Sequence, residues 1–381
     1  MTGYLQEVQA ATTPIERMTV SAFEIPTDGP EGKESDGTLE WSSTTMVLVE
    51  LRHGSHTGIG FTYADVSAAH FIESKLRPVV VGAELLAPAA LWEKMHATIR
   101  NAGQPGAGMM AMSAVDIAVW DLKARVLGVP LVHLLPAYHD QVPVYGSGGF
   151  TNYPLERLAD QLGGWAEQGI PRVKLKTSRH PDEDPKRLAA VRDAVGSGTE
   201  IFVDANGALG RKEAVCWAER FYDEWEVRWF EEPVSSADIV GLRRVRERAP
   251  GSLEVAAGEY GYELGDFTAL IEGGAVDCLQ ADVTRCGGIT GVLQVDGLAA
   301  ARNIDLSAHC APALSAHAFC GVRRLRHLEY FHDHVRIESM FFDGTLPLEA
   351  GTLRPDPSQP GLGLSLRKAD ADRYRVFESA A

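Results

Sequence analysis

The stretch PRVKLKTSRH (171–180) reads as a short β-strand that ends in a turn. Side chains alternate between the two faces of a strand, so Lys174 and Lys176 point to one face while Val173 and Leu175 point to the other. Two ammonium groups on one side of an apolar strand are costly, and a soluble protein has easier places for lysine. We therefore expect the lysine face to look onto something that uses positive charge.

Strands of this kind recur from about residue 142 onward, separated by segments long enough for one amphipathic helix. The eight expected strands are VPVYGSG, RVKLKT, EIFVDAN, VRWFEEP, LEVAAGE, VDCLQAD, IDLSAHC and HLEYF. Repeated βα units predict a parallel sheet, and eight of them predict closure as a TIM barrel. The alternative is a doubly wound open sheet, but no GxGxxG pattern follows the first strand.

Seven consecutive strands finish on an ionisable residue, one βα unit apart. These residues are Lys176, Asp204, Glu231, Glu259, Asp282, His309 and Glu329. The carboxyl ends of barrel strands meet at one mouth, which is where barrel enzymes carry their catalytic groups. We therefore expect the seven side chains to converge there.

Three of these strand ends supply carboxylates, namely Asp204, Glu231 and Glu259. Three converging carboxylates without cysteine or histidine form an all-oxygen site that suits Mg²⁺. For any one acid alone, a helix cap or an ion pair inside the barrel is the alternative. We expect Glu231 rather than Glu232 to face inward, because Pro233 should hold the preceding residue extended and preserve the alternation.

The two lysines fit the same site. A nearby divalent cation and a neighbouring ammonium group both lower the pKa of a buried lysine. Lys176, nearer the strand end, is therefore expected to act as a general base, and the deeper Lys174 to stay protonated and steady an anion. The alternative is a pair of surface lysines on an edge strand.

His309 and Asp282 end adjacent strands and are expected to form a dyad. An aspartate that accepts from one imidazole nitrogen fixes the tautomer and raises the basicity of the other nitrogen. Glu329 should lie near the carboxylates and lysines, where burial would keep it neutral and let it donate a hydrogen bond to an oxyanion. The combined set is suited to removing a proton α to a carboxylate.

The first 140 residues lack this rhythm. TTMVLVEL (44–51) and HTGIGFTY (56–63) predict an antiparallel pair, and residues 114–128 predict a helix that ends at a glycine. The segment IPTDGPEGKESDGTLEW (25–41) is rich in proline, glycine and acidic residues, and predicts a mobile loop outside the core.

Composition narrows the class of protein. The 381 residues carry a formal net charge of −16, which argues against nucleic acid or an anionic membrane as a partner. Five scattered cysteines without a CxxC pair indicate reduced thiols. No apolar run approaches transmembrane length. We expect a soluble cytoplasmic protein.

The strand-end motifs, taken together and in order, resemble the enolase superfamily and within it the mandelate racemase subgroup. They are KLK (174–176), VDAN (203–206), WFEEP (229–233), AAGE (256–259), QADVTRCGGITG (280–291), SAHCAP (307–312) and HLEYF (327–331), preceded by SAVDIAVWDLKARVLGVPLVHLL (113–135). The resemblance extends over nearly the whole chain, and the catalytic set shows no departure from the family pattern.

The resemblance implies an α/β fold: a modified (β/α)8 barrel with an α+β N-terminal cap that the C-terminal segment completes. It places the cap at residues 1–140, the barrel at 141–340 and the C-terminal segment at 341–381, with 25–41 as the loop that closes over substrate.

Roles for the site residues also follow from the resemblance. It makes Asp204, Glu231 and Glu259 the Mg²⁺ ligands, and Lys176 and the His309–Asp282 dyad the opposed acid/base groups. It places Lys174 and Glu329 against the substrate carboxylate and the enediolate. It also implies a small carboxylate substrate and a homo-oligomer, often an octamer.

The favoured reaction is dehydration of a sugar acid, an aldonate or aldarate, to a 2-keto-3-deoxy acid. Racemisation or epimerisation of a 2-hydroxy acid by 1,1-proton transfer is the alternative. A protein that binds Mg²⁺ and an acid without turnover should lack a base, and none is missing. A Schiff-base aldolase built on Lys176 has no use for three metal ligands.

Four further residues are weighed without being assigned to the site. Trp41 and Tyr63 can line the pocket or belong to the core, and His332 and His334 are expected at the surface or an interface.

Overall fold

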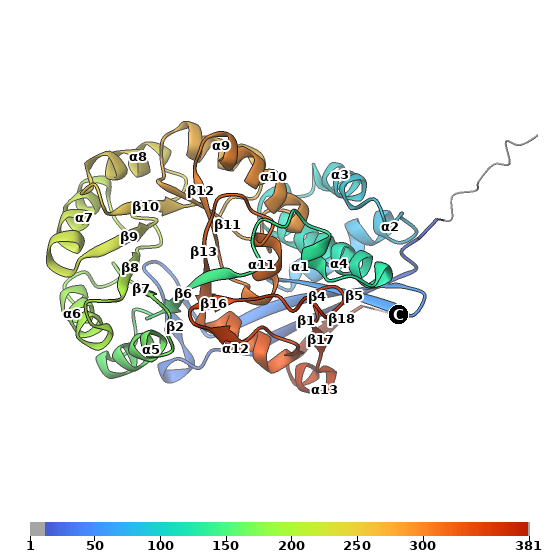
Figure 1. The fold of residues 1–381 in the computed structure, drawn as a ribbon, viewed down its shortest axis with the longest axis horizontal. Coiled ribbons are helices and arrows are strands. Elements are labelled where there is room, and N and C mark those ends of the chain that lie inside the picture. Colours follow the sequence, from blue (N-terminus) through green and yellow to red (C-terminus); the bar gives the residue numbers. More distant parts are fainter. Residues whose placement is uncertain (1–11, 380–381) are drawn as a thin grey trace, which may run out of the picture.

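The computed structural model describes residues 12–379 and contains a closed barrel beside an α+β cap (Figure 1). The barrel strands are β6 (Val142–Gly148), β7 (Arg172–Lys176), β8 (Glu200–Asp204), β9 (Val227–Glu231), β10 (Glu254–Ala257), β11 (Cys278–Ala281), β12 (Asp305–Ala308) and β13 (Leu325–Phe331). Each strand pairs in parallel with the next, and β13 pairs in parallel with β6, so the sheet closes. The barrel prediction is confirmed, and the open doubly wound sheet is excluded.

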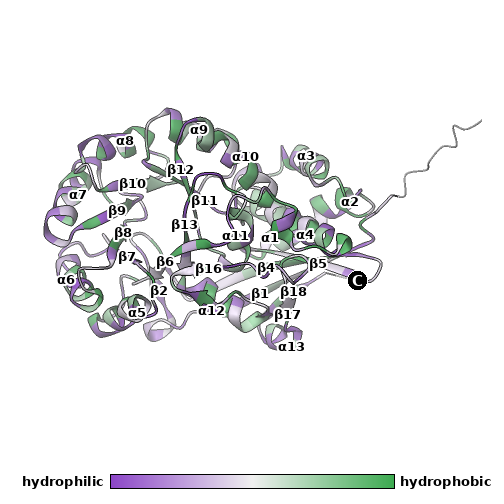
Figure 2. Ribbon diagram, in the orientation of Figure 1, coloured by the Kyte–Doolittle hydropathy of each residue, from purple (hydrophilic) through white to green (hydrophobic). Residues whose placement is uncertain are grey.

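A helix follows every barrel strand. These helices are α5 (Leu155–Glu167), α6 (Asp184–Val195), α7 (Arg211–Trp225), α8 (Ile239–Arg248), α9 (Leu264–Glu272), α10 (Gly288–Ala301), α11 (Pro312–Phe319) and α12 (His332–Phe341). Figure 2 shows hydrophilic and hydrophobic residues side by side on the outer helices, as expected for helices with one face on a sheet and one in water. Inside the barrel, below the mouth, an apolar layer of Tyr145, Phe202, Trp229, Ala256 and Cys278 fills the space.

Strand register sets the arrangement at the mouth. Lys176 is paired with Asp204, and Asp204 with Glu231, across three neighbouring strands. The three side chains therefore start from the same level of the barrel, and the short distances between them follow from backbone pairing.

The cap is built on an antiparallel sheet of order β18-β1-β4-β5. Its elements are β1 (Arg17–Pro26), β2 (Glu34–Ser35), β3 (Glu40–Trp41), β4 (Ser43–His53), β5 (His56–Tyr63), α1 (Ser67–Phe71), α2 (Arg77–Val80), α3 (Pro88–Ile99) and α4 (Met109–Leu127). The chain's last part contributes β14 (Phe342–Asp343), β15 (Leu348–Glu349), β16 (Thr352–Leu353), β17 (Ser365–Leu366), α13 (Lys368–Ala371) and β18 (Arg375–Glu378). Because β18 pairs with β1, the C-terminal segment completes the cap, as expected. Among the described residues, no helix combines the length and apolarity needed to span a bilayer.

The loop 25–41 differs from the expectation that it lies outside the core. Its centre forms the β2–β3 hairpin, and Glu34 and Ser35 are buried. The backbone N–H of Thr151 donates to Ser35 O at 2.8 Å, and Arg179 Nη1 donates to Leu39 O at 3.0 Å. The polar residues are buried because barrel loops far away in the sequence supply their hydrogen-bond partners.

Gly37 marks the tightest contact of this loop with the barrel. A Cβ atom on Gly37 would lie 2.2 Å from Ala205 O and 3.0 Å from Thr177 O, at the ends of β8 and β7. Both neighbours are backbone atoms next to Asp204 and Lys176, so they cannot yield without moving the site.

Gly37→Ala is therefore expected to lift the loop from the barrel mouth and lower kcat/KM by about 10-fold or more, mainly through KM. Steady-state kinetics and the rate of tryptic cleavage after Lys33 measure the effect. Gly198→Ala, at an exposed position with open space around its Cβ, is the matched control. Unchanged kinetics in Gly37→Ala would show that the seating of this loop does not matter for substrate binding.

Candidate active site

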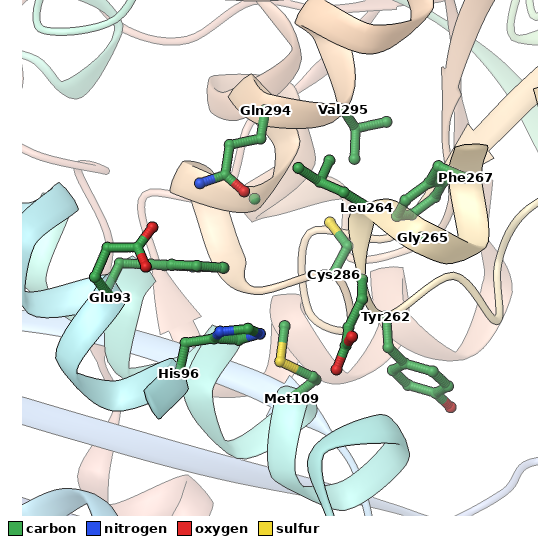
Figure 3. A pocket seen from close by; sticks show the side chains of 13 residues that line it. Glu93, His96, Met109, Tyr262, Leu264, Gly265, Phe267, Cys286, Gln294 and Val295 are labelled. Carbon is green, nitrogen blue, oxygen red and sulfur yellow. The ribbon is translucent and has the colours of Figure 1, made fainter. Parts of the chain in front are cut away.

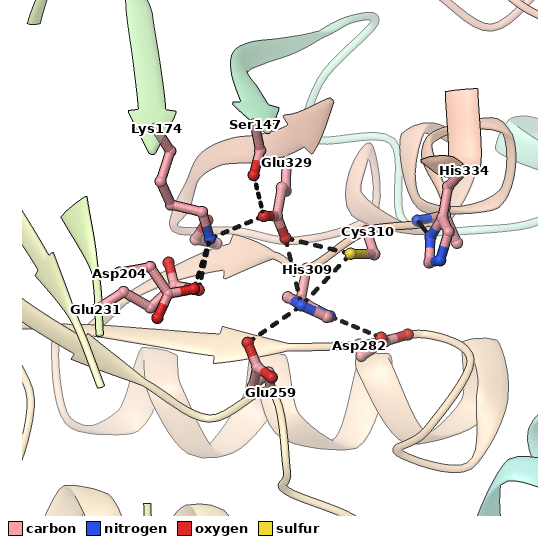
Figure 4. Close-up of polar contacts among 12 residues, drawn as sticks. Ser147, Lys174, Asp204, Glu231, Glu259, Asp282, His309, Cys310, Glu329 and His334 are labelled. Atoms are coloured by element: carbon pink, nitrogen blue, oxygen red, sulfur yellow. Dashed lines mark hydrogen bonds and ion pairs between the residues drawn. The ribbon is translucent and has the colours of Figure 1, made fainter. Parts of the chain in front are cut away.

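The barrel mouth brings together the side chains that the strand ends predicted (Figure 4). All eight predicted site residues are buried: Lys174, Lys176, Asp204, Glu231, Glu259, Asp282, His309 and Glu329. Buried charges persist in proteins when they are paired, and every member of this set has at least one charged partner in the set.

The lysine pair lies against two of the carboxylates. Lys174 Nζ donates to Glu231 Oε1 at 2.5 Å and lies 2.8 Å from Glu329 Oε1. Lys176 Nζ donates to Asp204 Oδ2 at 2.5 Å. The lysine face of the opening stretch therefore looks onto acids from three other strands, and the edge-strand alternative is wrong.

These ion pairs oppose the lowering of the Lys176 pKa that we expected from a nearby cation. Burial lowers the pKa of Lys176, but the Asp204 carboxylate outweighs burial and holds that pKa above its usual value. The same balance, with Glu231 as the main partner, raises the pKa of Lys174. The expectation considered a cation and the neighbouring ammonium group, and it did not include the carboxylate that each lysine contacts.

Glu259 reaches the site through an unusual backbone. It lies two residues beyond the end of β10, after Gly258, whose φ is +137°. A Cβ on Gly258 would lie 2.2 Å from Gln280 O, so both the conformation and the space require glycine.

The three carboxylates are arranged so that they could hold a metal ion. One oxygen from each of Asp204, Glu231 and Glu259 lies within 4.8 Å of the other two, and all three residues are buried. Glu259 Oε2 accepts no hydrogen bond within the described chain, and its charged neighbour is His309 Nε2 at 3.2 Å. An all-carboxylate set with one such oxygen fits the ligand preference of Mg²⁺.

Glu231 points into the barrel, towards Lys174, but the reason given for it is only partly right. Glu232 is not extended before Pro233: its φ is +38°. Its N–H donates to Ala256 O at 2.9 Å, and its carbonyl accepts from Gly207 N–H at 2.8 Å. The strand ends at Glu231, and these two backbone bonds hold the next residue in the left-handed region.

His309 and Asp282 form the expected pair. His309 Nδ1 lies 2.7 Å from Asp282 Oδ2, while the N–H and hydroxyl of Thr284 each donate to Asp282 Oδ1 at 2.7 Å. His309 Nε2 faces the acids, 3.2 Å from Glu259 Oε2 and 3.3 Å from Glu329 Oε2. The aspartate is thus fixed by the turn that follows its strand, and it orients the imidazole towards the centre of the site.

Glu329 differs from the neutral acid that we expected. Burial raises the pKa of Glu329, but Lys174 and His309 outweigh burial and hold that pKa well below its usual value. Burial likewise lowers the pKa of His309, and the acidic groups around it, Cys310 and Glu259 first among them, hold it well above 6.5. Both directions favour the charged forms, a carboxylate for Glu329 and an imidazolium for His309.

Three residues in contact with the site were not predicted. Ser147 Oγ donates to Glu329 Oε1 at 2.6 Å, Cys310 Sγ lies 3.3 Å from Glu329 Oε2, and Arg285 Nη1 lies 3.6 Å from Glu259 Oε1. Ser147 could have been found, because it shares strand parity with Tyr145 near the end of the first barrel strand. Its hydroxyl is not ionisable, so the pattern of ionisable strand ends does not include it.

His334 corrects another expectation, because it is buried instead of lying at the surface. Its ring stacks on Tyr63 with centroids 3.4 Å apart, and its Nδ1 accepts from Ala311 N–H at 3.1 Å. Beside it, Glu338 Oε1 accepts from the Tyr63 hydroxyl at 3.2 Å, and Glu338 Oε2 accepts from Ala313 N–H at 2.9 Å. Cap strand β5 and helix α12 are joined here.

Glu338 predicts a pH dependence of stability. Burial raises the pKa of Glu338 to about 8, against an ordinary value of 4.5. Between these values the folded protein binds more protons than the unfolded chain, so this group lowers the free energy of unfolding as pH rises from about 5 to 8.

Glu338 should lower the free energy of unfolding by up to ~1.4 kcal/mol per pH unit in this range. Glu338→Gln should remove this pH dependence, while Glu272→Gln, on the exposed end of α9, should keep it. Urea unfolding at pH 5, 6, 7 and 8 measures it. Parallel pH profiles for wild type and Glu338→Gln would contradict the assignment.

A separate cavity of about 310 Å³ lies between the cap and the barrel helices (Figure 3). Its lining includes Trp92, His96 and Met109 from the cap side and Phe267, Cys286 and Gln294 from the barrel side. None of the eight predicted site residues lines it, so it is distinct from the mouth of the barrel.

The family of the chain follows from its matches to two known domain families. Residues 35–136 match the mandelate racemase / muconate lactonizing enzyme N-terminal domain, and residues 157–371 match the enolase C-terminal domain-like family. The chain belongs to the enolase superfamily, in its mandelate racemase subgroup. The family predicted from the strand-end motifs is confirmed.

Individual members of this subgroup resemble the chain closely. A mandelate racemase/muconate lactonizing enzyme-like protein from Rubrobacter xylanophilus superposes with a TM-score of 0.93 at 57% identity, covering 95% of this chain and 100% of that one. The L-talarate/galactarate dehydratase of Salmonella typhimurium LT2, with Mg and L-lyxarohydroxamate bound, gives 0.88 at 27% identity, covering 100% and 97%. The 3,6-anhydro-alpha-L-galactonate cycloisomerase of Streptomyces coelicolor is 30% identical over 321 residues, which are 83% of this chain and 88% of that enzyme.

Proposed function

We propose that the protein is a Mg²⁺-dependent lyase that removes the proton α to the carboxylate of a sugar acid and dehydrates it to a 2-keto-3-deoxy acid. The main support for this proposal is the arrangement at the barrel mouth. Three carboxylates lie close together there, Lys176 is paired with one of them, and the His309–Asp282 dyad faces another. The Salmonella relative, a sugar-acid dehydratase with Mg bound, supports the choice of metal and substrate class.

The proposed metal ligands are Asp204, Glu231 and Glu259. When bound there, Mg²⁺ supplies positive charge to the oxygens of the substrate carboxylate. Lys174 adds a second positive charge: it is fully buried and held by Glu231 and Glu329, so it needs no reorganisation when negative charge develops on the substrate.

Lys176 is the proposed base that takes the α-proton. Its ion pair with Asp204 raises its pKa, and sharing Asp204 with a bound cation would weaken that pair and lower the pKa of Lys176. The electron pair of the broken C–H bond moves into the carboxylate and gives an enediolate.

His309 is the proposed acid for the β-hydroxyl. Its proton goes to the departing oxygen, the C–O bond breaks, and water leaves. The resulting enol tautomerises to the 2-keto-3-deoxy acid. Asp282 keeps the imidazole oriented throughout, since its other oxygen is fixed by Thr284.

A panel of aldonic and aldaric acids, with lactone and anhydro forms included, tests the proposal when assayed for 2-keto acid in the presence of Mg²⁺. At least one member should be turned over with a stoichiometric yield of keto acid. Failure of every member to react would remove the dehydratase assignment.

Racemisation or epimerisation of a 2-hydroxy acid is the second candidate, because two acid/base groups, Lys176 and His309, lie at the same mouth. A base on each face of the α-carbon is what 1,1-proton transfer needs. Incubation in D₂O separates the two reactions: incorporation of deuterium at the α-carbon without formation of keto acid selects the racemase.

A further inference from the structure

A second group of side chains that could hold a metal ion lies where the loop 25–41, here called the cap loop, meets the barrel. It consists of Asp28, Glu34, His332 and Asp333, which we call the cap-loop cluster. Each residue offers one donor atom, and these atoms all lie within 4.8 Å of one another. Asp28 and Glu34 come from the cap loop, whereas His332 and Asp333 begin helix α12. The cluster shares no residue with the barrel-mouth site.

Two carboxyl groups at its centre are buried and incompletely satisfied. Glu34 Oε1 accepts from the Tyr153 hydroxyl at 2.9 Å, but Glu34 Oε2 has no hydrogen-bond donor within residues 12–379. Asp333 Oδ2 has only long contacts, 3.4 Å to Trp41 Nε1 and 3.3 Å to Thr44 Oγ1, and Asp333 Oδ1 accepts no hydrogen bond there. Both residues have an exposed fraction of 0%. A buried carboxyl oxygen without a partner is costly, so a positive species is expected between them.

Basic side chains form ion pairs with the outer members of the cluster but not with Glu34 at its centre. Arg157 Nη2 lies 3.0 Å from Asp28 Oδ1, and Arg336 Nη2 lies 3.7 Å from Asp333 Oδ1. His332 Nε2 lies 2.9 Å from Asp28 Oδ1. No lysine, arginine or histidine nitrogen of the described chain comes within 4 Å of a Glu34 oxygen to form an ion pair.

We propose that Asp28, Glu34, His332 and Asp333 bind a second divalent cation, of the Zn²⁺ or Mn²⁺ type, that fastens the cap loop to the first turn of α12. Three carboxylates and one imidazole form a mixed oxygen and nitrogen set, which suits these ions better than Mg²⁺. Ligands on opposite sides of an ion at about 2.0–2.4 Å are at most about 4.8 Å apart, so the spacing admits one ion.

The rival occupant is a proton shared by Glu34 and Asp333. Burial and the Asp333 carboxylate raise the pKa of Glu34 to about 9, so a proton can bridge the two groups. A shared proton accounts for the two buried carboxyls alone, whereas a cation also engages Asp28 and His332. The proposal therefore gives the half-buried His332 a role that the proton does not.

The experiment is titration of metal-stripped full-length protein with Zn²⁺ by calorimetry and with Co²⁺ by visible absorption. Glu34→Gln and His332→Ala should each bind one equivalent of Zn²⁺ fewer than wild type, and His332→Ala should lose the Co²⁺ band of a nitrogen-containing site. Glu31→Gln, exposed in the same loop, should bind as many equivalents as wild type, and Glu259→Gln, at the barrel mouth, should keep the Co²⁺ band of the nitrogen-containing site.

A structural readout accompanies the titration. Zn²⁺ should slow tryptic cleavage after Lys33, which is exposed in the loop, in wild type and not in Glu34→Gln. His332 is partly exposed, so its alanine variant remains informative if Glu34→Gln misfolds. Equal Zn²⁺ stoichiometry in wild type and both cluster variants would overturn the proposal and leave the shared proton. Neither readout depends on turnover, so the result stands apart from the dehydratase assignment.

Discussion

His309→Asn is expected to lower kcat for dehydration by about 10³-fold, because the departing hydroxyl loses its acid. In the structure His309 Nε2 is the end of the imidazole that faces the acids of the site, and Asp282 holds the opposite nitrogen at 2.7 Å. Asparagine keeps polarity and approximate volume, so the loss should be chemical. Steady-state assay of keto acid measures it, and His56→Asn, exposed on β5, is the control.

The same variant separates the two halves of the reaction. Lys176 is untouched in His309→Asn, so exchange of the α-proton with D₂O should continue while dehydration stops. Lys176→Met should do the reverse and abolish the exchange that begins the reaction. Near-normal keto acid formation by His309→Asn would place the acid elsewhere in the site.

Removal of the metal is expected to be equally severe. Chelation should abolish activity, Mg²⁺ should restore it, and Glu259→Gln should weaken Mg²⁺ binding and lower kcat/KM by about 10³-fold. Glu259 is the informative ligand because glutamine keeps its size and removes only its charge, although the 3.2 Å contact of Oε2 with His309 Nε2 is weakened as well. Calorimetric titration with Mg²⁺ and steady-state kinetics measure both effects.

Asp204→Asn is the harsher comparison. It removes the partner of Lys176 and leaves a buried ammonium group without its closest carboxylate, which typically costs about 3–5 kcal/mol of stability. The melting temperature should therefore fall further in Asp204→Asn than in Glu259→Gln. Full activity of either variant without added metal would contradict a metal-dependent mechanism.

Much of this site follows from strand periodicity. Lys176, Asp204 and Glu231 could be placed together because each ends a strand, and parallel register then sets them side by side. Glu259, Asp282 and His309 were also found by this rule, although each lies just beyond the last residue of its strand. Residues one or two positions beyond a strand end still reach the site, because the mouth of a barrel is narrow.

The charge states could not be predicted in the same way. The expectation for Lys176 rested on repulsion from a cation, whereas the structure pairs it with Asp204 at 2.5 Å. Glu329 was expected to be neutral, whereas its contact with Lys174 lowers its pKa and favours the carboxylate. Such balances depend on distances of a few tenths of an ångström between residues from different strands, and sequence spacing does not fix them.

The burial of the cap loop could not be predicted from the sequence either. Proline, glycine and acidic residues indicated an element outside the core, yet Glu34 is buried and contacts Tyr153 from the barrel. The partners of its polar groups come from segments more than 100 residues away, so composition alone could not reveal them. His334 was misplaced for the same reason, since the ring that covers it, Tyr63, belongs to the cap.

Diffraction from crystals grown with Mn²⁺ as a substitute for Mg²⁺ tests the central claim most directly, through anomalous scattering at the barrel mouth. An anomalous peak is expected about 2.0–2.4 Å from oxygens of Asp204, Glu231 and Glu259, with Lys176 and His309 on opposite sides of it. A barrel mouth without a peak at saturating Mn²⁺, or with either base turned away from the ion, would contradict the account.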